Sequence, residues 1–373
     1  NLKYFNFITG LTMTNKYFDN LFGISRRNKE EKILQIHMDI ASSIQKVTEK
    51  ILLLILKYAK EKYKYENLCL SGGVALNCVA NGKIYKEGMF KNIWIQPASG
   101  DAGGSMGAAL AYYYFYQANQ RIKNVTNISS SYLGPKYQND EIIKYLNSID
   151  AKFYELDEQT LLDDISNEII SGKIIGWFQG RTEFGPRALG NRSIIADSRN
   201  PDMQRILNLK TKFREGFRPF APSILEEEVN NWFDFDSPSP YMLMVGQVKK
   251  DKLKNIDTLS YSKKDLTSIN QIRSSIPAVT HVDNSARIQT VSKDSNKIFY
   301  ELIKAFHKKT GVPILINTSF NVNNEPIVNT YYDAYHCFMN SNIDILVLNN
   351  ILLKRAEQYS RKPNDLFKNE NLS

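Results

Sequence analysis

Two strand-like runs, each followed by a glycine turn and a helical run, constrain the fold of this chain most strongly. NLCL precedes SGG and the helical stretch VALNCVANGKIYKEG, and NIWIQP precedes ASGDAGG and SMGAALAYYYFYQ. Glycine turns that lead from the carboxyl end of a strand into a helix are typical of α/β proteins. Helical patterns near 140–147, 158–171, 201–209 and 297–310 then alternate with the strand-like runs KIIGWF, SIIA, VPILIN and IDILVL. We therefore predict an α/β fold along most of the chain.

The chain has 373 residues, which is longer than one average domain. An amphipathic pattern predicts a long helix within residues 31–64, and hydrophobic periodicity is lost between about 119 and 139. We predict a first domain over residues 1–120, a linker over 121–138, a second domain over 139–355 and a polar tail over 356–373.

Cysteine usage and hydropathy indicate a cytoplasmic protein. Cys69, Cys78 and Cys337 form no CxxC pair and are odd in number, which argues against a disulfide framework and against a zinc site. The longest apolar run, ILLLIL at 51–56, is far shorter than the roughly 18 to 20 residues that cross a bilayer. We expect no membrane partner.

A basic, turn-rich segment follows in the second half of the chain. The stretch GRTEFGPRALGNRS, residues 180–193, combines glycines and a proline with three arginines. Residues 181–218 contain four acids and nine basic residues, namely Arg181, Arg187, Arg192, Arg199, Arg205, Lys210, Lys212, Arg214 and Arg218. This local imbalance indicates an anionic small molecule or a nucleic acid, whereas the net charge of +9 is spread over the whole chain.

Two glycine turns are further candidate sites. Gly72 and Gly73 stand between a strand and a helix, an arrangement that receives phosphate groups but that is also common without a ligand. Asp101 lies in the second turn, where it could ligate a metal ion or equally cap the helix that follows. His281, Asp283 and Arg287 lie in a strand-like run, and Asn317 and Ser319 end another.

These motifs, in this order, resemble those of the O-carbamoyltransferases of nodulation-factor and antibiotic biosynthesis. The resemblance is carried by LSGGVALNCVAN, GDAGGSMGAAL, GWFQGRTEFGPRALGNRS, KFREGFRPFAPSILEE, AVTHVDNSARIQTV and GVPILINTSFNVNNEPIV, and it runs from about Leu21 to Leu353. It implies the C-terminal part of an actin/hexokinase-like (Kae1-like) domain followed by a YrdC-like α/β domain. It also implies that carbamoyl phosphate and ATP form carbamoyl adenylate, whose carbamoyl group passes to a hydroxyl of a small-molecule or glycan acceptor.

The same resemblance implies roles for individual residues. Around the carbamoyl phosphate or adenylate it places Lys212, Arg214, Asn317 and Ser319, with Arg187, Arg192, Arg218 and Arg287 lining the same cavity. In the first domain it implies that Gly72, Gly73 and Asn77 hold the nucleotide and that Asp101 ligates the metal. The implied cofactors are ATP and Mg²⁺, with Fe²⁺ or another divalent metal in the Kae1-like domain.

The chain departs from the family pattern at three places. The metal-binding histidines of the family lie in an N-terminal portion without a counterpart here, so we expect a fragment that lacks this half. Asn284 and Ser285 stand where the family usually has Gly and Thr, and Asn324 stands where Gly is usual. Asparagine accepts a positive φ more readily than most residues, so we expect these turns to form.

Two alternative functions stay open at this point. One is an RNA-associated protein related to tRNA modification, which would present exposed aromatic side chains among the arginines. Phe184, Phe213, Phe217 and Phe220 lie there, but their Pro/Gly setting is typical of loop anchoring, so a small-molecule partner is favoured over nucleic acid. The other is a truncated remnant without activity.

Overall fold

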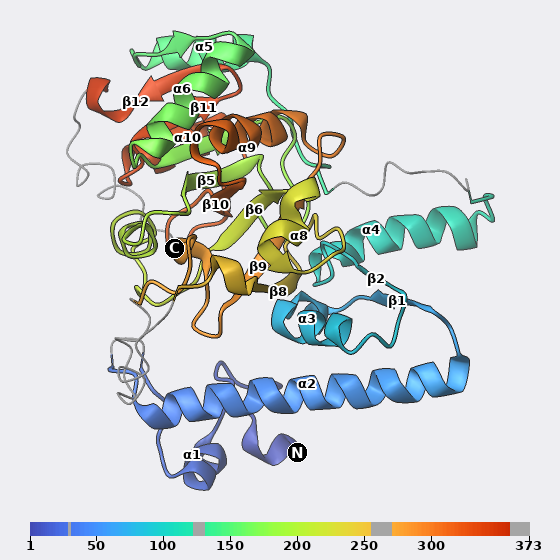
Figure 1. The fold of residues 1–373 in the computed structure, drawn as a ribbon. Helices are drawn as coiled ribbons and strands as arrows, with labels where there is room; N and C mark the ends of the chain where they lie inside the picture. Colours follow the sequence, from blue (N-terminus) through green and yellow to red (C-terminus); the bar gives the residue numbers. More distant parts are fainter. Residues whose placement is uncertain (29–30, 122–130, 255–270, 359–373) are drawn as a thin grey trace. The chain divides into compact units, whose positions relative to one another are not determined.

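The structure is a computed structural model that describes residues 1–28, 31–121, 131–254 and 271–358 (Figure 1). Part of the predicted linker, residues 122–130, and most of the predicted polar tail, residues 359–373, lie outside the described residues. The chain divides into two compact units, Asn1–Lys64 and Tyr65–Ser373. Across the described residues, no helix combines the length and the apolar character needed to cross a membrane.

The first unit is helical. It contains α1 (Lys16–Phe22) and the long helix α2 (Gln35–Tyr63). The Asn15 side chain caps α1 by accepting from the Tyr17 N–H, and Gly23 ends that helix at φ +67°. α2 confirms the helix predicted within residues 31–64. It ends at Lys64, which adopts a left-handed conformation with φ 57°.

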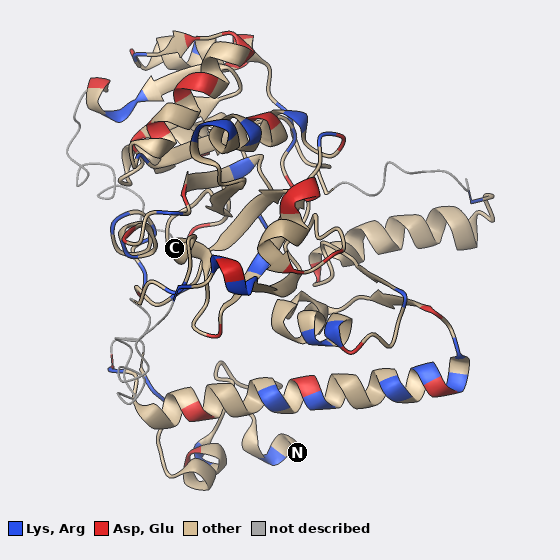
Figure 2. Ribbon diagram, in the orientation of Figure 1, with Lys and Arg blue, Asp and Glu red and all other residues tan. Residues whose placement is uncertain are grey.

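The second unit begins with the strand, turn and helix pattern that the sequence predicts. β1 (Asn67–Leu70) and β2 (Asn92–Ile95) form a two-stranded parallel sheet, with α3 (Cys78–Lys86) between them. α4 (Ala102–Ala111) follows β2, carries no charged residue (Figure 2) and continues into a π-helical turn at Tyr112–Tyr116. A parallel pair needs a crossover connection, which α3 supplies.

The rest of the second unit is built on one mixed sheet. In the described residues the strand order is β3-β12-β11-β4-β5-β10-β6-β9-β8-β7, with parallel pairing between β11 and β4 and between β6 and β9. The strands are β3 (Tyr154–Glu155), β4 (Ile175–Phe178), β5 (Arg192–Asp197), β6 (Ala221–Leu225), β7 (Phe233–Asp234), β8 (Met244–Val248), β9 (Ser285–Val291), β10 (Ile314–Ser319), β11 (Ile345–Leu348) and β12 (Ile351–Lys354).

Helices cover both faces of this sheet (Figure 1). Side chains of α6 (Glu158–Ile170) and α9 (Lys297–Thr310) share one buried cluster with Trp177 and Leu315, and those of α5 (Asn139–Ser148) and α10 (Tyr331–Met339) share another with Phe178 and Ile316. Successive side chains of a strand point to opposite faces, which is why neighbours such as Trp177 and Phe178 enter different clusters. Two short helices, α7 (Met203–Ile206) and α8 (Val229–Trp232), complete this part.

α3 packs directly on β8. The ideal Cβ of Gly82 would lie 2.5 Å from Val245 Cγ2, so only glycine permits this approach. The buried Asn81 side chain donates to the Ala75 carbonyl at 2.8 Å and to the Leu243 carbonyl at 3.0 Å. This contact joins α3 to β8 and so to the large sheet.

The α/β architecture is confirmed, and so are helices at 139–148, 158–170 and 297–310. The helix predicted at 201–209 appears as α7 followed by a π-helical turn at Leu207–Thr211. The domain limits at 1–120 and 139–355, and the Kae1-like and YrdC-like assignments, stay predictions.

Candidate anion-binding site

Four arginines that are far apart in the sequence line one cavity of the second unit. This arginine cavity has a volume of about 420 Å³ and is lined by Arg187, Arg214, Arg218 and Arg287 together with Thr318 and Ser319. Among the described residues that line it there is no Asp or Glu. A group of guanidinium side chains in a concave site without a lining carboxylate is suited to phosphate or carboxylate oxygens.

The loop between β4 and β5 carries Arg187, and a buried carboxylate holds this loop in shape. Glu183 Oε1 accepts hydrogen bonds from the N–H groups of Leu189 at 2.7 Å, Asn191 at 2.9 Å and Arg192 at 3.3 Å. Burial raises the pKa of Glu183, while the N–H groups of Leu189 and Asn191 and the charge of Arg192 act in the opposite direction.

Two glycines of this loop are required by geometry. Gly190 adopts φ +106°, and a Cβ there would lie 2.3 Å from the Phe299 ring. Gly185 adopts φ +140°, and a Cβ there would lie 3.1 Å from the Pro97 carbonyl oxygen. The turn-rich composition therefore allows the loop to pass close to α9 and to the end of β2, and it fixes where Arg187 lies.

Arg214 and Arg218 lie on the segment that follows the π-helical turn. The buried Asn208 side chain organises this segment, since it donates to the carbonyls of Gly216 at 3.1 Å and Arg218 at 2.8 Å. Burial, then the neighbouring charge of Arg218, lowers the pKa of Arg214 to about 10. Arg218 is more exposed and pairs with Glu215 at 2.9 Å.

Arg287 enters the cavity from β9, where it lies opposite Val245 of β8. Its pKa is lowered to about 10 by burial, then by the charge of Arg187, with a smaller effect of Arg214. Cys78, the first residue of α3, acts on Arg287 in the opposite direction and lines the cavity as well. The mutual repulsion of these cations is relieved when an anion binds between them.

Lys212 lies beneath the cavity wall rather than on it. Its buried ammonium group donates to the carbonyl of Ser319, to Ser319 Oγ at 3.2 Å, and to the carbonyl and side-chain oxygens of Asn321 at 3.0 and 2.8 Å. Burial, then the charge of Arg214, lowers the pKa of Lys212 to about 7. Lys212 thus ties the arginine-bearing segment to the end of β10.

Two further predicted residues, Arg192 and Asn317, do not line the cavity either. Arg192 is fully buried, its guanidinium donates to the carbonyl of Gln179 at 2.6 Å, and its Cζ lies 3.5 Å from the Phe178 ring centroid. Asn317 is also fully buried and donates to Gln289 Oε1 at 2.7 Å and to the Ala188 carbonyl at 3.2 Å. Arg192 therefore does not line the cavity as predicted, because its guanidinium group donates hydrogen bonds to backbone oxygens instead.

His281 also lines the cavity, next to the turn that leads into β9. Its Nδ1 lies 3.0 Å from Ser285 Oγ, and Ser285 Oγ donates to Asp283 Oδ1 at 2.7 Å. Burial lowers the pKa of His281 to about 4, against the opposing effect of Asp283. Asn284, in this turn, adopts φ +62°, and Asn324 adopts φ +67°, so both asparagines occupy the left-handed region as expected.

The glycine turns after β1 and β2 lie side by side, because the Gly72 N–H donates to the Ser99 carbonyl at 2.8 Å. Gly72 and Gly73 are exposed, and Asn77 caps α3 by accepting from the Ala80 N–H at 3.1 Å. None of these three, nor Asp101, lines the arginine cavity. Their predicted nucleotide contacts stay predictions.

Asp101 is exposed at the start of α4 and makes no capping hydrogen bond there. In the part of the chain that the structure describes, no three His, Cys, Asp or Glu residues gather in a way that could hold a metal ion. The described residues therefore do not form a metal centre by themselves, and the metal role of Asp101 stays a prediction.

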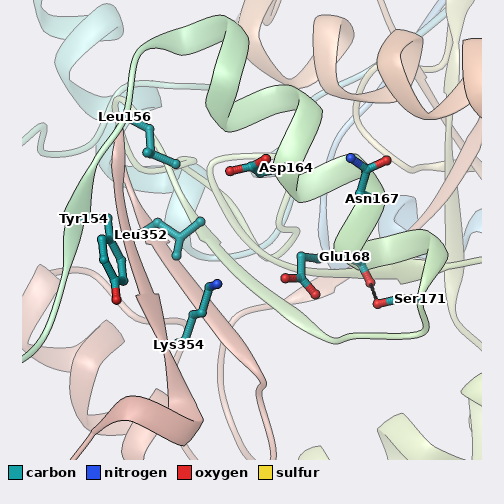
Figure 3. A pocket seen from close by; sticks show the side chains of 8 residues that line it. All are labelled: Tyr154, Leu156, Asp164, Asn167, Glu168, Ser171, Leu352 and Lys354. Carbon is teal, nitrogen blue, oxygen red and sulfur yellow. Dashed lines mark hydrogen bonds between the residues drawn. The ribbon is translucent and has the colours of Figure 1, made fainter.

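Another cavity, of about 460 Å³, lies between α6 and the strands β3 and β12 (Figure 3). Asp164 and Glu168 are among its lining residues, with Tyr154 and Lys354 on the opposite side. Its carboxylates make it unsuitable for the anions that the arginine cavity would accept.

Sequence reasoning missed several residues that form or support the site. Cys78 lines the cavity, whereas Glu183 and Asn208 hold its two loops. His281, a candidate from the sequence, lines the cavity as well. Glu183, inside the GRTEFGPR motif, and Asn208, just before KTKFRE, can be noticed in the sequence. Their hydrogen-bond partners cannot be predicted from it.

The fold and the site together define an α/β protein with a cavity lined by four arginines. Family models described as "Carbamoyltransferase C-terminus" and "Carbamoyltransferase N-terminus" match residues 166–355 and 1–110. The chain belongs to the carbamoyltransferase family, as the motif resemblance predicts.

Several curated relatives are similar over most of the chain. An uncharacterized protein of Synechocystis is 49% identical over 99% of this chain and 61% of its own length. Nodulation protein NolNO of Sinorhizobium fredii is 39% identical over 91% of this chain and 48% of its own length. Nodulation protein NolO of Bradyrhizobium diazoefficiens is 37% identical over 90% of this chain and 58% of its own length. The chain therefore spans about half to three-fifths of the length of these relatives.

Among solved structures, the full-length HypF crystal structure in its phosphate- and nucleotide-bound form is similar with a TM-score of 0.33. The two chains are 16% identical, and the match covers 56% of this chain and 23% of that one. A similarity at this level supports no inference about fold or function.

Proposed function

We propose that this protein takes part in ATP-dependent carbamoyl transfer and that the arginine cavity binds carbamoyl phosphate and the carbamoyl adenylate formed from it. In the proposed reaction, water releases phosphate from carbamoyl phosphate, and an oxygen of the resulting carbamate attacks the α-phosphorus of ATP, supplied as its Mg²⁺ complex, so that carbamoyl adenylate forms and pyrophosphate leaves. A hydroxyl oxygen of the acceptor then attacks the carbamoyl carbon, and AMP leaves. The acceptor would be a small molecule or a glycan.

The observation that carries this proposal is the gathering of four guanidinium groups in a cavity without a lining carboxylate. Both substrates are densely anionic, so their approach costs Coulomb energy unless fixed cations offset it. Burial, together with the charges of Arg187 and Arg214, lowers the pKa of Arg287, and an anion bound among these three cations would offset their repulsion. No step of the reaction is assigned to a protein-bound metal.

Pyrophosphate release from ATP in the presence of carbamoyl phosphate and Mg²⁺ tests the proposal. We expect carbamoyl-phosphate-dependent release, reduced roughly tenfold or more in Arg214→Ala, since a charge-assisted contact contributes about 1.5 to 3 kcal/mol. Arg205→Ala is the matched control, because Arg205 is exposed and pairs with Asp202 outside the cavity. Release that is equal in the parent chain and in Arg214→Ala would contradict the proposal.

One observation favours the RNA alternative enough to test it. Phe220 is buried, but Phe213 is 50% exposed and Phe217 is 37% exposed beside the arginines, so the loop-anchoring interpretation holds for Phe220 and not for these two. Exposed aromatic rings among cations can stack on bases. Binding of tRNA at physiological ionic strength that is lost in Phe213→Ala would favour this alternative over carbamoyl transfer.

A further inference from the structure

The second unit contains another cavity whose walls are mainly carbon. This aromatic cavity has a volume of about 360 Å³ and lies between β2 and the segment 235–244 that leads into β8. Five aromatic side chains line it, namely Tyr85, Phe90, Trp94, Phe235 and Tyr241. The rings of Tyr85 and Phe235 lie 4.8 Å apart between centroids. Aromatic side chains in this number provide a large apolar contact area at a small entropic cost.

Three hydroxyl groups of the walls are already bonded within the protein. The Tyr85 hydroxyl is hydrogen-bonded to Asp236, and it accepts from Ser237 Oγ at 3.3 Å. Ser239 Oγ donates to the Ile288 carbonyl at 2.9 Å. These bonds occupy the hydroxyl groups of Tyr85, Ser237 and Ser239, so that the walls offer a ligand mainly ring faces.

The charge of the lining also restricts the ligand. Among the described residues that line the aromatic cavity there is no Asp or Glu, and Lys91 is the one cation. A cationic amino sugar would need carboxylates, and a polyhydroxylated sugar would need several free hydrogen-bonding groups, because an unpaired buried polar group costs about 1 to 3 kcal/mol. A neutral, mostly apolar ring system needs neither carboxylates nor several free hydrogen-bonding groups, and it therefore fits these walls.

The aromatic cavity adjoins the arginine cavity. Tyr241, Leu243 and Met244 line the aromatic cavity, whereas Met242, in the same segment, lines the arginine cavity. Met242 adopts φ +59°, which differs from the extended backbone of the strand that follows. One short stretch of chain thus forms the wall between both sites.

We propose that the aromatic cavity binds a neutral aromatic or other apolar ring of the molecule whose hydroxyl group receives the carbamoyl group. Calling this molecule the acceptor rests on the proposed function, but the binding itself does not. Trp94 is central to the proposal, since its ring is 46% exposed and lines the cavity. Its indole N–H makes no hydrogen bond to any described residue and can donate to an oxygen of the ligand.

Binding of 2-naphthol, a neutral hydroxylated aromatic probe, tests the proposal by calorimetry or ligand-detected NMR on the full chain, without ATP or carbamoyl phosphate. We expect 2-naphthol to bind and Trp94→Ala to weaken it roughly tenfold or more, with Trp94→Phe in between, because a buried aromatic contact of this kind dominates binding. Tyr154→Ala, an exposed aromatic residue of the cavity in Figure 3, is the matched control and should bind like the parent.

Equal affinity of Trp94→Ala and the parent for 2-naphthol would overturn the proposal. So would tighter binding of methyl glucoside than of 2-naphthol, since it would point to a sugar site. Circular dichroism of each variant confirms that it is folded. If 2-naphthol fails to bind while pyrophosphate release persists, only this inference falls; if it binds while release is absent, only the proposed function falls.

Discussion

Arg214 Nε donates a hydrogen bond to Asn208 Oδ1 at 2.7 Å, and the guanidinium Cζ lies 5.1 Å from the ring centroid of Phe220. Because the Asn208 amide also binds the Gly216 and Arg218 carbonyls, one buried side chain orients two of the cavity arginines. The direction of the Arg214 side chain therefore depends on how Asn208 is held within the segment.

Replacing Asn208 with Ala should therefore weaken the use of carbamoyl phosphate. We expect the KM for carbamoyl phosphate in the pyrophosphate assay to rise roughly tenfold, with a smaller change in kcat, since a misplaced cation loses binding energy. Asn231→Ala is the control, because that exposed asparagine bonds Glu228. An unchanged KM in a folded Asn208→Ala protein would remove its positioning role.

Lys212→Met tests the buried ammonium group. The substitution keeps most of the side-chain volume but removes the donor to the Asn321 carbonyl and one of the two donors to Asn321 Oδ1 and to the Ser319 carbonyl. We expect the free energy of unfolding to fall by about 2 to 4 kcal/mol in urea titrations, because buried acceptors lose their partner. Lys210→Met, at an exposed position two residues earlier, should change it by less than about 0.5 kcal/mol. Equal stabilities of the two variants would argue against the network.

A pair of glycine substitutions separates steric clash from backbone strain. Gly172 and Gly190 both have positive φ, but a Cβ at Gly172 meets nothing within 4 Å, whereas at Gly190 it meets Phe299. We expect Gly172→Ala to cost about 1 kcal/mol of unfolding free energy and Gly190→Ala at least about 2 kcal/mol more. Thermal or urea unfolding measures both free energies. Similar losses of unfolding free energy in the two variants would show that the β4–β5 loop can shift to accommodate the added methyl group.

The buried His281 should make stability depend on pH below neutrality. Its folded pKa is about 4, whereas an unfolded histidine titrates near 6.5, so between these values the unfolded chain binds a proton that the folded chain excludes. Stability should therefore fall as pH decreases from about 6.5 to about 4. Asp283 and Arg287 are the charges that act on this group, in opposite directions.

The variant His281→Asn is the control for this pH dependence, because asparagine can still form a hydrogen bond with Ser285 but does not titrate. The difference in unfolding free energy between the two proteins should change over this pH interval and be constant above about pH 7. Parallel pH profiles would mean that His281 titrates normally in the folded state.

Local patterns were sufficient for the α/β class and for several helices. Spacing of apolar residues and glycine turns depends on neighbours in the chain, so α5, α6 and α9 appear where the sequence predicts them. The helix α10 and the strands β8 and β12 were not predicted from the sequence. Their apolar residues can be assigned to the core only when the neighbouring strands of the sheet are known.

Residue types alone determined that this chain carries an excess of guanidinium groups in a glycine-rich setting, and the order of its motifs determined its family. Tertiary structure decided which of those groups share a cavity: Arg187, Arg214 and Arg287 meet across three separate segments, while Arg192, in the same motif as Arg187, is buried against backbone carbonyls. The physical reason is that the sequence gives the charge of an arginine but not the direction of its side chain, which is set by the folded loop around it, through hydrogen bonds such as those of Glu183 and Asn208.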